Sequence, residues 1–574
     1  MEPSEPRQTN ETVAMRIAGA FRRHGVDLVF GQSIPSAFHL VAPQFGITQA
    51  AYRTENAGGA MADGYARIAR RVGVVTAQNG PAATLLVPPL AEALKASVPV
   101  IALVQDVALT ATGRNAFQEL DHLRLFDGCA KWVRRIDHVS RVDDTIDMAF
   151  TAATSGRPGP AVLLVPADLL NVVAQPVEVR TAGLGHTPLD RSTPDPAKVA
   201  EAAALLSAAE RPLVIAGGGV HTSDASEALM RLQETCHLPV ATTVMGKGCV
   251  DETHTLSLGV VGYAMGKGSR TAALRPMIED ADVILLIGNR TNQNGTDSWT
   301  LYPKTARYIH VDIDGTEIGR NYEAVRLVGD ARRAIDALRF AVTSTGLHKR
   351  AAVRGDVAAR ITAAMDSWRS TTLSIRTDGQ TPVRPEQVMD VLDRGIDGDT
   401  IVVADASYAS IWVANYLTAR KAGQRFLTPR GLAGLGWGLP MAIGAKLAAP
   451  DKRVVCLAGD GGFAHTWAEL EMLRRMDLDI TVLVLNNQVL GYQKDAEDAT
   501  FGAHTDACYF EPVDHAMIAR ACGCEAATVA TPDDLAPALS HALGSGTPYL
   551  VDIQIDPEAR PPITAFEGQF RDPY

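Results

Sequence analysis

Two short apolar runs near the C-terminal end of the chain each end in polar residues that could bind a metal ion. The run Arg453–Ala458 leads into Gly-Asp-Gly-Gly at Gly459–Gly462, and the run Ile480–Leu485 is followed by two asparagines, the second being Asn487. Both runs are short, aliphatic and closed by turn-forming residues, which predicts buried parallel strands. Ligands of such sheets bind beyond the carboxyl ends of the strands, so Asp460 and Asn487 should lie side by side.

The residue types at this edge favour a magnesium ion bound to a diphosphate. A carboxylate at Asp460 and an amide oxygen at Asn487 are hard donors that suit an octahedral Mg²⁺ carrying phosphates. Gly459, Gly461 and Gly462 would let the backbone approach a diphosphate closely. Gly-Asp-Gly by itself also marks ordinary turns, and it is the pairing of both elements at strand ends that favours a metal-diphosphate cofactor.

The pattern of these residues resembles that of thiamine-diphosphate (ThDP) enzymes. The resemblance implies that Mg²⁺ is held by Asp460, Asn487 and the main-chain carbonyl of Val489. It makes Leu435 the apolar wedge under a bent cofactor, although an ordinary core leucine would fit the same position. The residues that it assigns to cofactor binding are Leu435, Gly459, Gly461, Gly462, Asn487, Leu490, Gly491 and Tyr492.

An early stretch is similar to a second segment of the same family. Arg53–Arg67 follows a predicted strand and matches the family's "HE…A…ADGYAR" pattern, which assigns Glu55 to the cofactor's aminopyrimidine and to proton transfer. A buried site would raise the pKa of such a carboxyl toward neutrality and suit it to this role. The alternative for Glu55 is a helix N-terminal glutamate that the helix dipole favours.

Further segments resemble the acetohydroxyacid (acetolactate) synthase branch. Gly113–Asp121 is similar to its "G-x-x-A-F-Q-E-x-D" segment, which makes Gln118 a catalytic residue rather than a surface glutamine. Arg290 matches the first arginine of "RFDDR", which implies contact with an acceptor carboxylate; a surface ion pair is the alternative. Gly491–Ala496 departs from the aromatic "GMVRQWQ" run, so the choice of acceptor stays open.

The resemblance implies a ThDP- and Mg²⁺-dependent decarboxylating carboligase. Its donor would be a pyruvate-like 2-keto acid, and its product a 2-hydroxy-3-keto acid or an acyloin. One alternative is a ThDP lyase or decarboxylase of another C–C bond, in a 2-hydroxyacyl-CoA, a diketone or a sulfoaldehyde. Another is a cofactor-binding paralogue without catalytic activity, which the retention of Glu55, Asp460 and Asn487 argues against.

The length of 574 residues and the alternation of predicted strands and helices indicate an α/β protein of several domains. We expect three doubly wound parallel-sheet domains: pyrimidine-binding at 12–175, central and Rossmann-like at 197–343, and diphosphate-binding at 385–560, with a tail at 561–574 that is a lid or a disordered end. In the synthases the central domain binds FAD, and the positions 217–219, 245–248, 288–290 and 312–314 loosely resemble that pattern. FAD, an adenine nucleotide or no ligand are open alternatives for the central domain.

Bulk composition restricts the partners and the location. A net charge of −11 argues against general nucleic-acid binding, and no apolar run approaches the ~18 residues of a membrane span. The polar first residues predict no secretory signal. Seven scattered cysteines favour reduced thiols in the cytoplasm. The resemblance further implies a small-molecule keto acid substrate and a homodimer or homotetramer with active sites between subunits.

Overall fold

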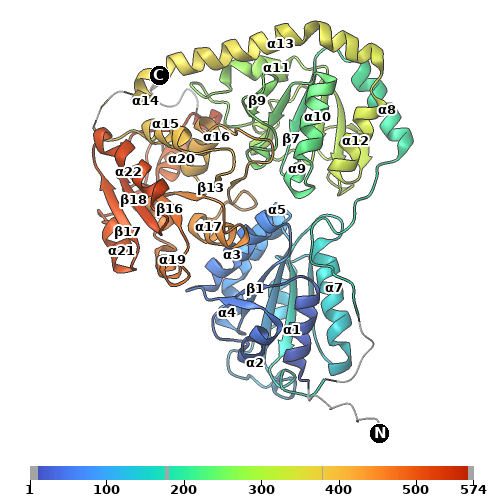
Figure 1. The fold of residues 1–574 in the computed structure, drawn as a ribbon, viewed down its shortest axis with the longest axis vertical. Coiled ribbons are helices and arrows are strands. Elements are labelled where there is room, and N and C mark those ends of the chain that lie inside the picture. The colour runs from blue at the N-terminus through green and yellow to red at the C-terminus, as the bar shows by residue number, and fades with distance from the viewer. Residues whose placement is uncertain (1–10, 175–179, 378, 380, 567–574) are drawn as a thin grey trace, which may run out of the picture. The chain divides into compact units, whose positions relative to one another are not determined.

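Three parallel sheets of six strands each, covered by helices on both faces, make up the fold (Figure 1). This computed structural model describes residues 11–174, 180–377, 379 and 381–566. The predicted α/β class with three doubly wound parallel sheets is confirmed. Among the described residues, no helix is both long enough and apolar enough to cross a lipid bilayer.

The first sheet has the strand order β2-β1-β3-β4-β6-β5. Its strands are β1 (Leu28–Phe30), β2 (Thr48–Ala50), β3 (Gly73–Ala77), β4 (Val100–Asp106), β5 (Trp132–Arg135) and β6 (Ala161–Pro166). Its helices are α1 (Val13–Arg23), α2 (Ser36–Val41), α3 (Glu55–Ala69), α4 (Pro81–Leu85), α5 (Val87–Ala96), α6 (His122–Asp127) and α7 (Val142–Thr154). Val13, Ile17 and Phe21 recur at helical spacing on α1 and pack with α7 in the core of this sheet.

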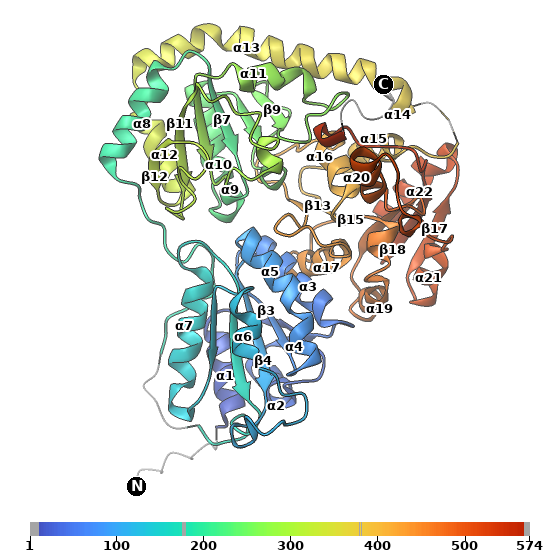
Figure 2. The same cartoon turned by 180° about the vertical axis from the view of Figure 1, so that it is seen from behind.

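The central sheet has the order β12-β11-β10-β7-β8-β9. Its strands are β7 (Pro212–Ala216), β8 (Val240–Thr242), β9 (Ser257–Val260), β10 (Val283–Ile287), β11 (Arg307–Asp312) and β12 (Ala324–Val328). Its helices are α8 (Pro196–Ala208), α9 (Gly219–Thr222), α10 (Ser226–Cys236), α11 (Arg275–Glu279), α12 (Ala331–Ala341), α13 (Ser344–Thr371) and α14 (Leu373–Thr377). Helices α8, α10 and α12 share a core with one face, and α11 and α13 with the other (Figure 2).

The third sheet has the order β14-β13-β15-β16-β18-β17. Its strands are β13 (Ile401–Ala404), β14 (Phe426–Leu427), β15 (Val454–Gly459), β16 (Ile480–Asn486), β17 (Glu525–Val529) and β18 (Tyr549–Gln554). Its helices are α15 (Pro385–Gly395), α16 (Tyr408–Tyr416), α17 (Gly438–Ala448), α18 (Asp460–Phe463), α19 (Leu470–Arg475), α20 (Gly491–Phe501), α21 (His515–Ala521) and α22 (Pro532–Gly544). Side chains of β15 and β16 are almost wholly buried, as their uninterrupted apolar sequences predict.

The chain divides into two compact units that do not follow the three sheets one to one. One unit runs to Asp190 and also contains Arg430–Gly434; the other contains the central and third sheets. Buried polar contacts join these two sheets: Lys247 Nζ lies 2.9 Å from both carboxylate oxygens of Glu252 and donates to Leu417 O at 2.7 Å. The expected boundaries of the three domains stay predictions, and residues 175–179 and 567–574 of the expected domains lie outside the described residues.

Candidate active site

Glu55 lies at the carboxyl edge of the first sheet, as the first residue of α3. The strand β2 ends at Ala50, and Thr54 caps the helix by accepting a hydrogen bond from the N–H of Ala57 at 3.3 Å. The glutamate side chain is partly buried, and its charge lies at the end of the helix where the dipole stabilises an anion. It therefore stands where a ligand of a parallel sheet would bind.

Gln118 reaches the same edge from a later loop. Its side-chain oxygen accepts a hydrogen bond from Gln78 at 2.8 Å, and its carbonyl accepts one from the Asn79 side chain at 3.1 Å. Gln78 and Asn79 directly follow β3, so the loop is tied to the end of a core strand. A second tether is His122, which accepts from the N–H of Gly80 at 2.9 Å and pairs with Asp106 at 3.0 Å. The first unit thus brings Glu55 and Gln118 to one sheet edge.

Asp460 and Asn487 follow neighbouring strands of the third sheet. β15 and β16 pair in parallel, with Gly459 opposite Leu485. The Asp460 carboxylate accepts a hydrogen bond from the N–H of Gln488 at 2.7 Å, and the Asn487 side-chain oxygen accepts one from the N–H of Val489 at 3.2 Å. The predicted juxtaposition is therefore present, and it results from the parallel register of two buried strands.

The glycines around Asp460 differ in how much space they leave. A Cβ added at Gly459 would meet nothing within 4 Å, whereas one at Gly461 would lie 2.8 Å from atoms of Leu490 and Phe510. A Cβ at Gly462 would overlap the carboxylate of Asp405. Gly461 and Gly462 are thus required by neighbouring side chains, and Gly459 faces open space that a diphosphate could enter.

These residues fit a magnesium ion and a diphosphate by their donor chemistry. Asp460 is 6% exposed, and burial raises the pKa of its carboxyl to about 6 while the N–H of Gln488 acts in the opposite direction. A divalent cation would offset the cost of burying this charge. The set of one carboxylate, one amide oxygen at Asn487 and the carbonyl of Val489 suits Mg²⁺. Among the described residues, no three acidic, histidine or cysteine side chains are grouped so that they could hold a metal ion.

Leu435 directly precedes a stretch that the buried carboxylate of Asp405 holds. Gly436, Trp437 and Gly438 donate backbone hydrogen bonds to Asp405 at 2.9, 3.1 and 3.2 Å. In the first unit, Glu92 of α5 accepts another set of backbone hydrogen bonds. Their donors are Gly431 at 2.7 Å, Leu432 at 2.5 Å and Ala433 at 3.3 Å.

Asp405 and Glu92 were not predicted from the sequence. Asp405 directly follows the apolar strand β13, so the same strand-end argument that singled out Asp460 could have found it. Glu92 gave no such signal, because it lies within a helix and its partners are more than 300 residues away along the chain.

Comparison with known proteins supplies the identity of the three sheets. Three family models match the chain. "Thiamine pyrophosphate enzyme, N-terminal TPP binding domain" matches residues 11–125, "Thiamine pyrophosphate enzyme, central domain" matches 199–338, and "Thiamine pyrophosphate enzyme, C-terminal TPP binding domain" matches 405–553. A probable acetolactate synthase large subunit from Methanocaldococcus jannaschii is 32% identical over 573 residues, which cover 96% of this chain and 93% of the relative. The chain belongs to the acetolactate synthase family of thiamine-diphosphate enzymes.

A second relative agrees with this assignment. The acetolactate synthase isozyme 3 large subunit of Escherichia coli strain K12 is 30% identical over 548 residues, with 93% of this chain and 92% of the relative covered. The resemblance predicted from the sequence is thereby confirmed, and the chain is a thiamine-diphosphate-dependent enzyme of the acetolactate synthase type.

In this acetolactate synthase-family chain, helix α20 begins directly after the residues predicted to bind metal. Gly491 is its first residue, and a Cβ there would lie 3.1 Å from the ring of Tyr408. The ring of Tyr492 packs between those of Tyr408 and Phe566, at centroid distances of 5.6 and 5.5 Å. Leu490 lies beside Gly461 of the Asp460 loop, whereas Tyr492 is 36% exposed and contacts Phe566 in the described start of the tail.

The polar residues of α20 are engaged in ion pairs. Lys494 Nζ lies 2.9 Å from the Glu558 carboxylate, and Asp495 pairs with Arg560 at 2.9 Å while accepting a hydrogen bond from the Tyr408 hydroxyl. These contacts fix the helix against the start of the tail. The described part of the tail ends at Phe566, so the choice between a lid and a disordered end falls partly outside the described residues.

Arg290 and the stretches 217–219 and 288–290 lie at the carboxyl edge of the central sheet. Arg290 Nε lies 3.7 Å from a carboxylate oxygen of Glu317, and contact of Arg290 with an acceptor carboxylate stays a prediction. The N–H of Gly217 donates to Ile287 O at 2.8 Å, and a Cβ on Gly217 would overlap the carbonyl of Gly288. Close packing of two strand ends thus explains these glycines without a dinucleotide.

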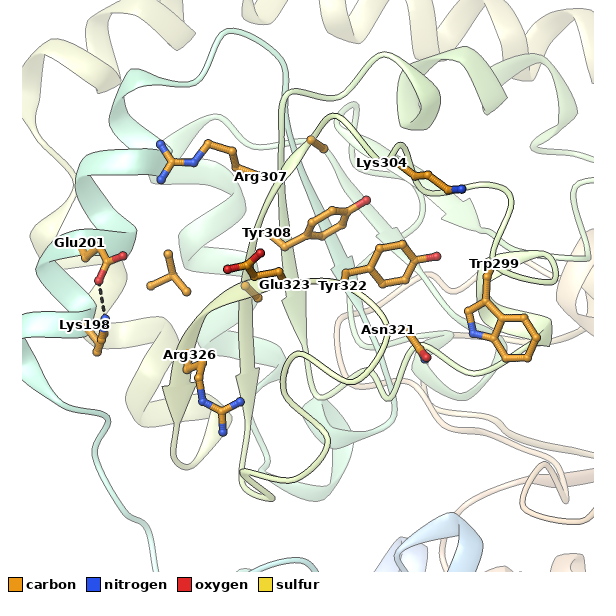
Figure 3. Close-up of a pocket in the computed structure, with 13 residues that line it drawn as sticks. Lys198, Glu201, Trp299, Lys304, Arg307, Tyr308, Asn321, Tyr322, Glu323 and Arg326 are labelled. Carbon is orange, nitrogen blue, oxygen red and sulfur yellow. Dashed lines mark hydrogen bonds and ion pairs between the residues drawn. The ribbon is translucent and has the colours of Figure 1, made fainter.

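A hollow of about 930 Å³ lies elsewhere on the central sheet (Figure 3). Arg307 and Ala324, the first residues of β11 and β12, contribute to its wall, together with the aromatic rings of Tyr308 and Tyr322. None of the residues predicted to act in catalysis or to bind metal or cofactor lines it. Because ligands of parallel sheets bind at the opposite, carboxyl edge, we assign no cofactor to this hollow.

Residues other than glycine adopt positive φ in several loops of the chain. In the first unit Gln118 has φ 61°, and in the second Ser407 has φ 66° and Gln488 φ 61°. Such conformations cost of order 1–3 kcal/mol each and persist where surrounding contacts enforce them.

Proposed function

We propose that this chain is a ThDP- and Mg²⁺-dependent decarboxylating carboligase that joins a pyruvate-like 2-keto acid to a second carbonyl compound. The observation that carries the proposal is the pairing of Asp460 with the Asn487–Val489 turn at the ends of adjacent strands. The names of the relatives, which are acetolactate synthase large subunits, support a 2-hydroxy-3-keto acid or an acyloin as product.

The residues predicted to act in catalysis and in metal binding have defined tasks in this proposal, and that of Arg290 is to contact the acceptor carboxylate. Asp460, Asn487 and the Val489 carbonyl would hold Mg²⁺, and Leu435 would support the bend of the cofactor. Glu55 would exchange a proton with N1′ of the aminopyrimidine, and Gln118 would face the substrate. When bound, thiamine diphosphate would supply the carbon nucleophile that adds to the keto group and the electron sink for the bonding pair left on the substrate carbon as CO₂ departs.

The proposal includes an active site shared between subunits of a homodimer or of a homotetramer. Several large apolar side chains around the Gln118 loop are exposed within a single chain: Leu85 by 46%, Phe117 by 83%, Leu120 by 43% and Leu123 by 40%. A second copy that covers them would remove this apolar surface from water. Scattering or gel filtration that gave a fully active monomer of 61.1 kDa would contradict the shared site.

FAD in the central domain and a cytoplasmic location are further parts of the proposal. FAD has the weaker support, because packing of backbone on backbone explains the glycines at Gly217 and Gly288. The cytoplasmic location is supported by the seven cysteines, all of which are free thiols. A flavin absorbance that survives desalting of the purified enzyme would establish FAD.

A lyase or decarboxylase acting on another C–C bond is the second candidate, and helix α20 favours it. Ala496 occupies the position where the synthases carry a tryptophan, and Lys494 is engaged with Glu558. The helix that shapes acceptor choice in the synthases therefore presents different chemistry here. Under this alternative the enzyme would break a C–C bond without forming a new one.

The deciding experiment is product analysis by mass spectrometry. Purified enzyme is incubated with ThDP, Mg²⁺ and pyruvate, with and without FAD and with and without a second carbonyl compound. Acetolactate or another C–C coupled product is expected. Free acetaldehyde, or no turnover of pyruvate, would overturn the carboligase and favour the lyase, whereas ThDP binding without turnover of any offered substrate would favour an inactive paralogue.

A further inference from the structure

Asp405 is a buried carboxylate whose only described hydrogen-bond donors are backbone N–H groups. It follows β13 and is 1% exposed. One oxygen accepts from Ala406 at 2.9 Å, from Trp437 at 3.1 Å and from Gly438 at 3.2 Å, and the other accepts from Gly436 at 2.9 Å. Four backbone N–H groups thus converge on one buried side chain, which anchors the backbone at the start of α17.

The same carboxylate also touches the loop that carries Asp460. A Cβ at Gly462 would overlap the second carboxylate oxygen of Asp405, and a Cβ at Gly438 would lie 2.9 Å from Asp405 Cβ. Gly436 packs directly on the same loop, because its Cβ would lie 2.9 Å from the carbonyl oxygen of Gly462. The stretch Gly436–Gly438 and the loop Gly459–Gly462 therefore both pack against the side chain of Asp405.

A further hydrogen bond ties the two segments together. The hydroxyl of Thr466, which follows α18, donates to the carbonyl of Gly436 at 2.8 Å. On one side of this junction lies Leu435, and on the other lies Asp460. The distance between the proposed wedge and the proposed metal ligand is thus set by a short path through Gly436, Asp405 and Gly462.

We propose that Asp405 is a positioning residue that fixes the segment bearing Leu435 against the loop Gly459–Gly462. The inference rests on the proposed function, in which this segment supports the bent cofactor and the loop holds its diphosphate. A cofactor held at both ends requires a fixed spacing between the two supports, and small misplacements of reacting groups reduce rates strongly. Asp405 would act through these segments and not on the substrate.

A purely structural role is the competing explanation. The N–H groups of Gly436, Trp437 and Gly438 stand at the start of α17, and Trp437 provides no side-chain cap. Asp405 satisfies donors that would otherwise be orphaned, so its loss would destabilise the helix whatever the enzyme does. The test must therefore measure the arrangement of the cofactor as well as stability.

The test compares Asp405→Asn with Asp330→Asn. Asp330 is 2% exposed and caps α12 by accepting from the N–H of Arg333 at 3.1 Å, while pairing with Arg191 at 3.0 Å, so it matches Asp405 in burial and in capping. For each full-length protein, calorimetry gives the Kd of Mg²⁺–ThDP and of Mg²⁺ with inorganic diphosphate. Quenched-flow NMR gives the rate of hydrogen–deuterium exchange at C2 of bound ThDP.

We expect Asp405→Asn to bind inorganic diphosphate like the wild type, to weaken ThDP binding and to slow C2 exchange by about tenfold or more. Asp330→Asn should lower the melting temperature while leaving both Kd values and the exchange rate unchanged. If Asp405→Asn alters only the melting temperature, the positioning role is overturned. Gly438→Ala provides a second route should Asp405→Asn fail to fold, because its Cβ displaces the segment from an intact Asp405.

Failure of this inference is distinguishable from failure of the proposed function. A wild type that binds ThDP and exchanges C2 hydrogen but forms no coupled product would overturn the proposed reaction while the positioning role stands. The positioning role alone would be overturned by two results together. The wild type would form product normally, and Gly438→Ala and Asp405→Asn would bind ThDP and exchange the C2 hydrogen as the wild type does. A wild type without affinity for ThDP would overturn both.

Discussion

The carboxylate of Asp460 accepts a hydrogen bond at 2.7 Å from the backbone N–H of Gln488, the residue that directly follows Asn487. The bond joins the ends of β15 and β16 and brings together the two side chains proposed to hold Mg²⁺. Gln488 adopts a positive φ of 61° at this point. The turn therefore keeps a strained conformation beside Asp460, in which the N–H of Val489 donates to the Asn487 side chain at 3.2 Å.

Asp460→Asn should abolish the stabilisation that Mg²⁺ and ThDP give the enzyme. A ligand present at a hundredfold excess over its Kd stabilises the native state by about 2.7 kcal/mol, and this gain should vanish in the variant. Without ligands the variant should be at least as stable as the wild type, because a buried charge without a cation is removed. Thermal melts with and without Mg²⁺–ThDP measure both effects, with exposed Asp451→Asn as the control. A ligand-dependent shift equal to that of the wild type would exclude Asp460 as a ligand.

Glu55→Gln should separate cofactor binding from turnover. The amide keeps the size of the side chain but cannot exchange a proton, and general acid–base catalysis contributes roughly 10²–10⁴-fold to rates. We therefore expect an unchanged Kd for ThDP and a loss of kcat in that range. Steady-state assays with saturating ThDP check this, and Glu227→Gln on the exposed surface of α10 is the control. Full activity in the variant would remove Glu55 from the mechanism.

Ser407→Gly should stabilise the folded protein. Ser407 has φ 66° and ψ −147°, a region that residues with a Cβ avoid. Relief of this strain is worth of order 1–3 kcal/mol, and the greater freedom of glycine in the unfolded chain opposes it by about 0.4–1 kcal/mol. A higher midpoint of urea unfolding is expected. Ser545→Gly, at a position with ordinary helical φ of −66°, serves as the comparison and should not be stabilised; a lower midpoint for Ser407→Gly would contradict the prediction.

The buried histidine His39 should make the first unit sensitive to acid. Burial lowers the pKa of His39 to about 4 from 6.5; its Nε2 is hydrogen-bonded to the Thr76 hydroxyl at 2.9 Å, and no described group is bonded to its Nδ1. Between these pH values the unfolded chain binds more protons than the folded one, so stability falls as pH falls through this window. The pKa difference corresponds to about 3 kcal/mol at most.

The His39 prediction is checked by unfolding in urea at several pH values. His39→Gln should reduce the loss of stability between neutral pH and about pH 4 relative to the wild type. The exposed His348→Gln serves as the control and should leave the pH dependence unchanged. An identical pH dependence of stability in wild type and His39→Gln would contradict a lower pKa of His39 in the folded protein than in the unfolded chain.

Local patterns in the sequence were sufficient to predict many elements and the main sheet edge. The runs before Asp460 and Asn487 match β15 and β16 to within one residue at either end. Short runs rich in aliphatic and β-branched residues and closed by glycine or asparagine favour buried parallel strands, so the polar residues at their carboxyl ends could be predicted to be neighbours.

Contacts across long separations in the chain could not be predicted in this way. Glu92 meets the N–H groups of Gly431–Ala433 because a helix and a loop that are remote in sequence pack together. The ion pair between Arg290 and Glu317 likewise depends on how two loops of the central sheet approach each other. Periodicity reports which face of an element is buried but not which distant group covers it.

The sequence by itself determined the fold class, the enzyme family and the residues at the ends of β15 and β16, because these follow from local patterning and recognisable motifs. Only the tertiary structure decided that Asp405 joins the Leu435 segment to the loop of Asp460, and that Lys494 and Asp495 are engaged in ion pairs. Such relationships depend on the three-dimensional packing of whole elements, since a side chain's partners are set by backbone positions that its neighbours in sequence do not specify.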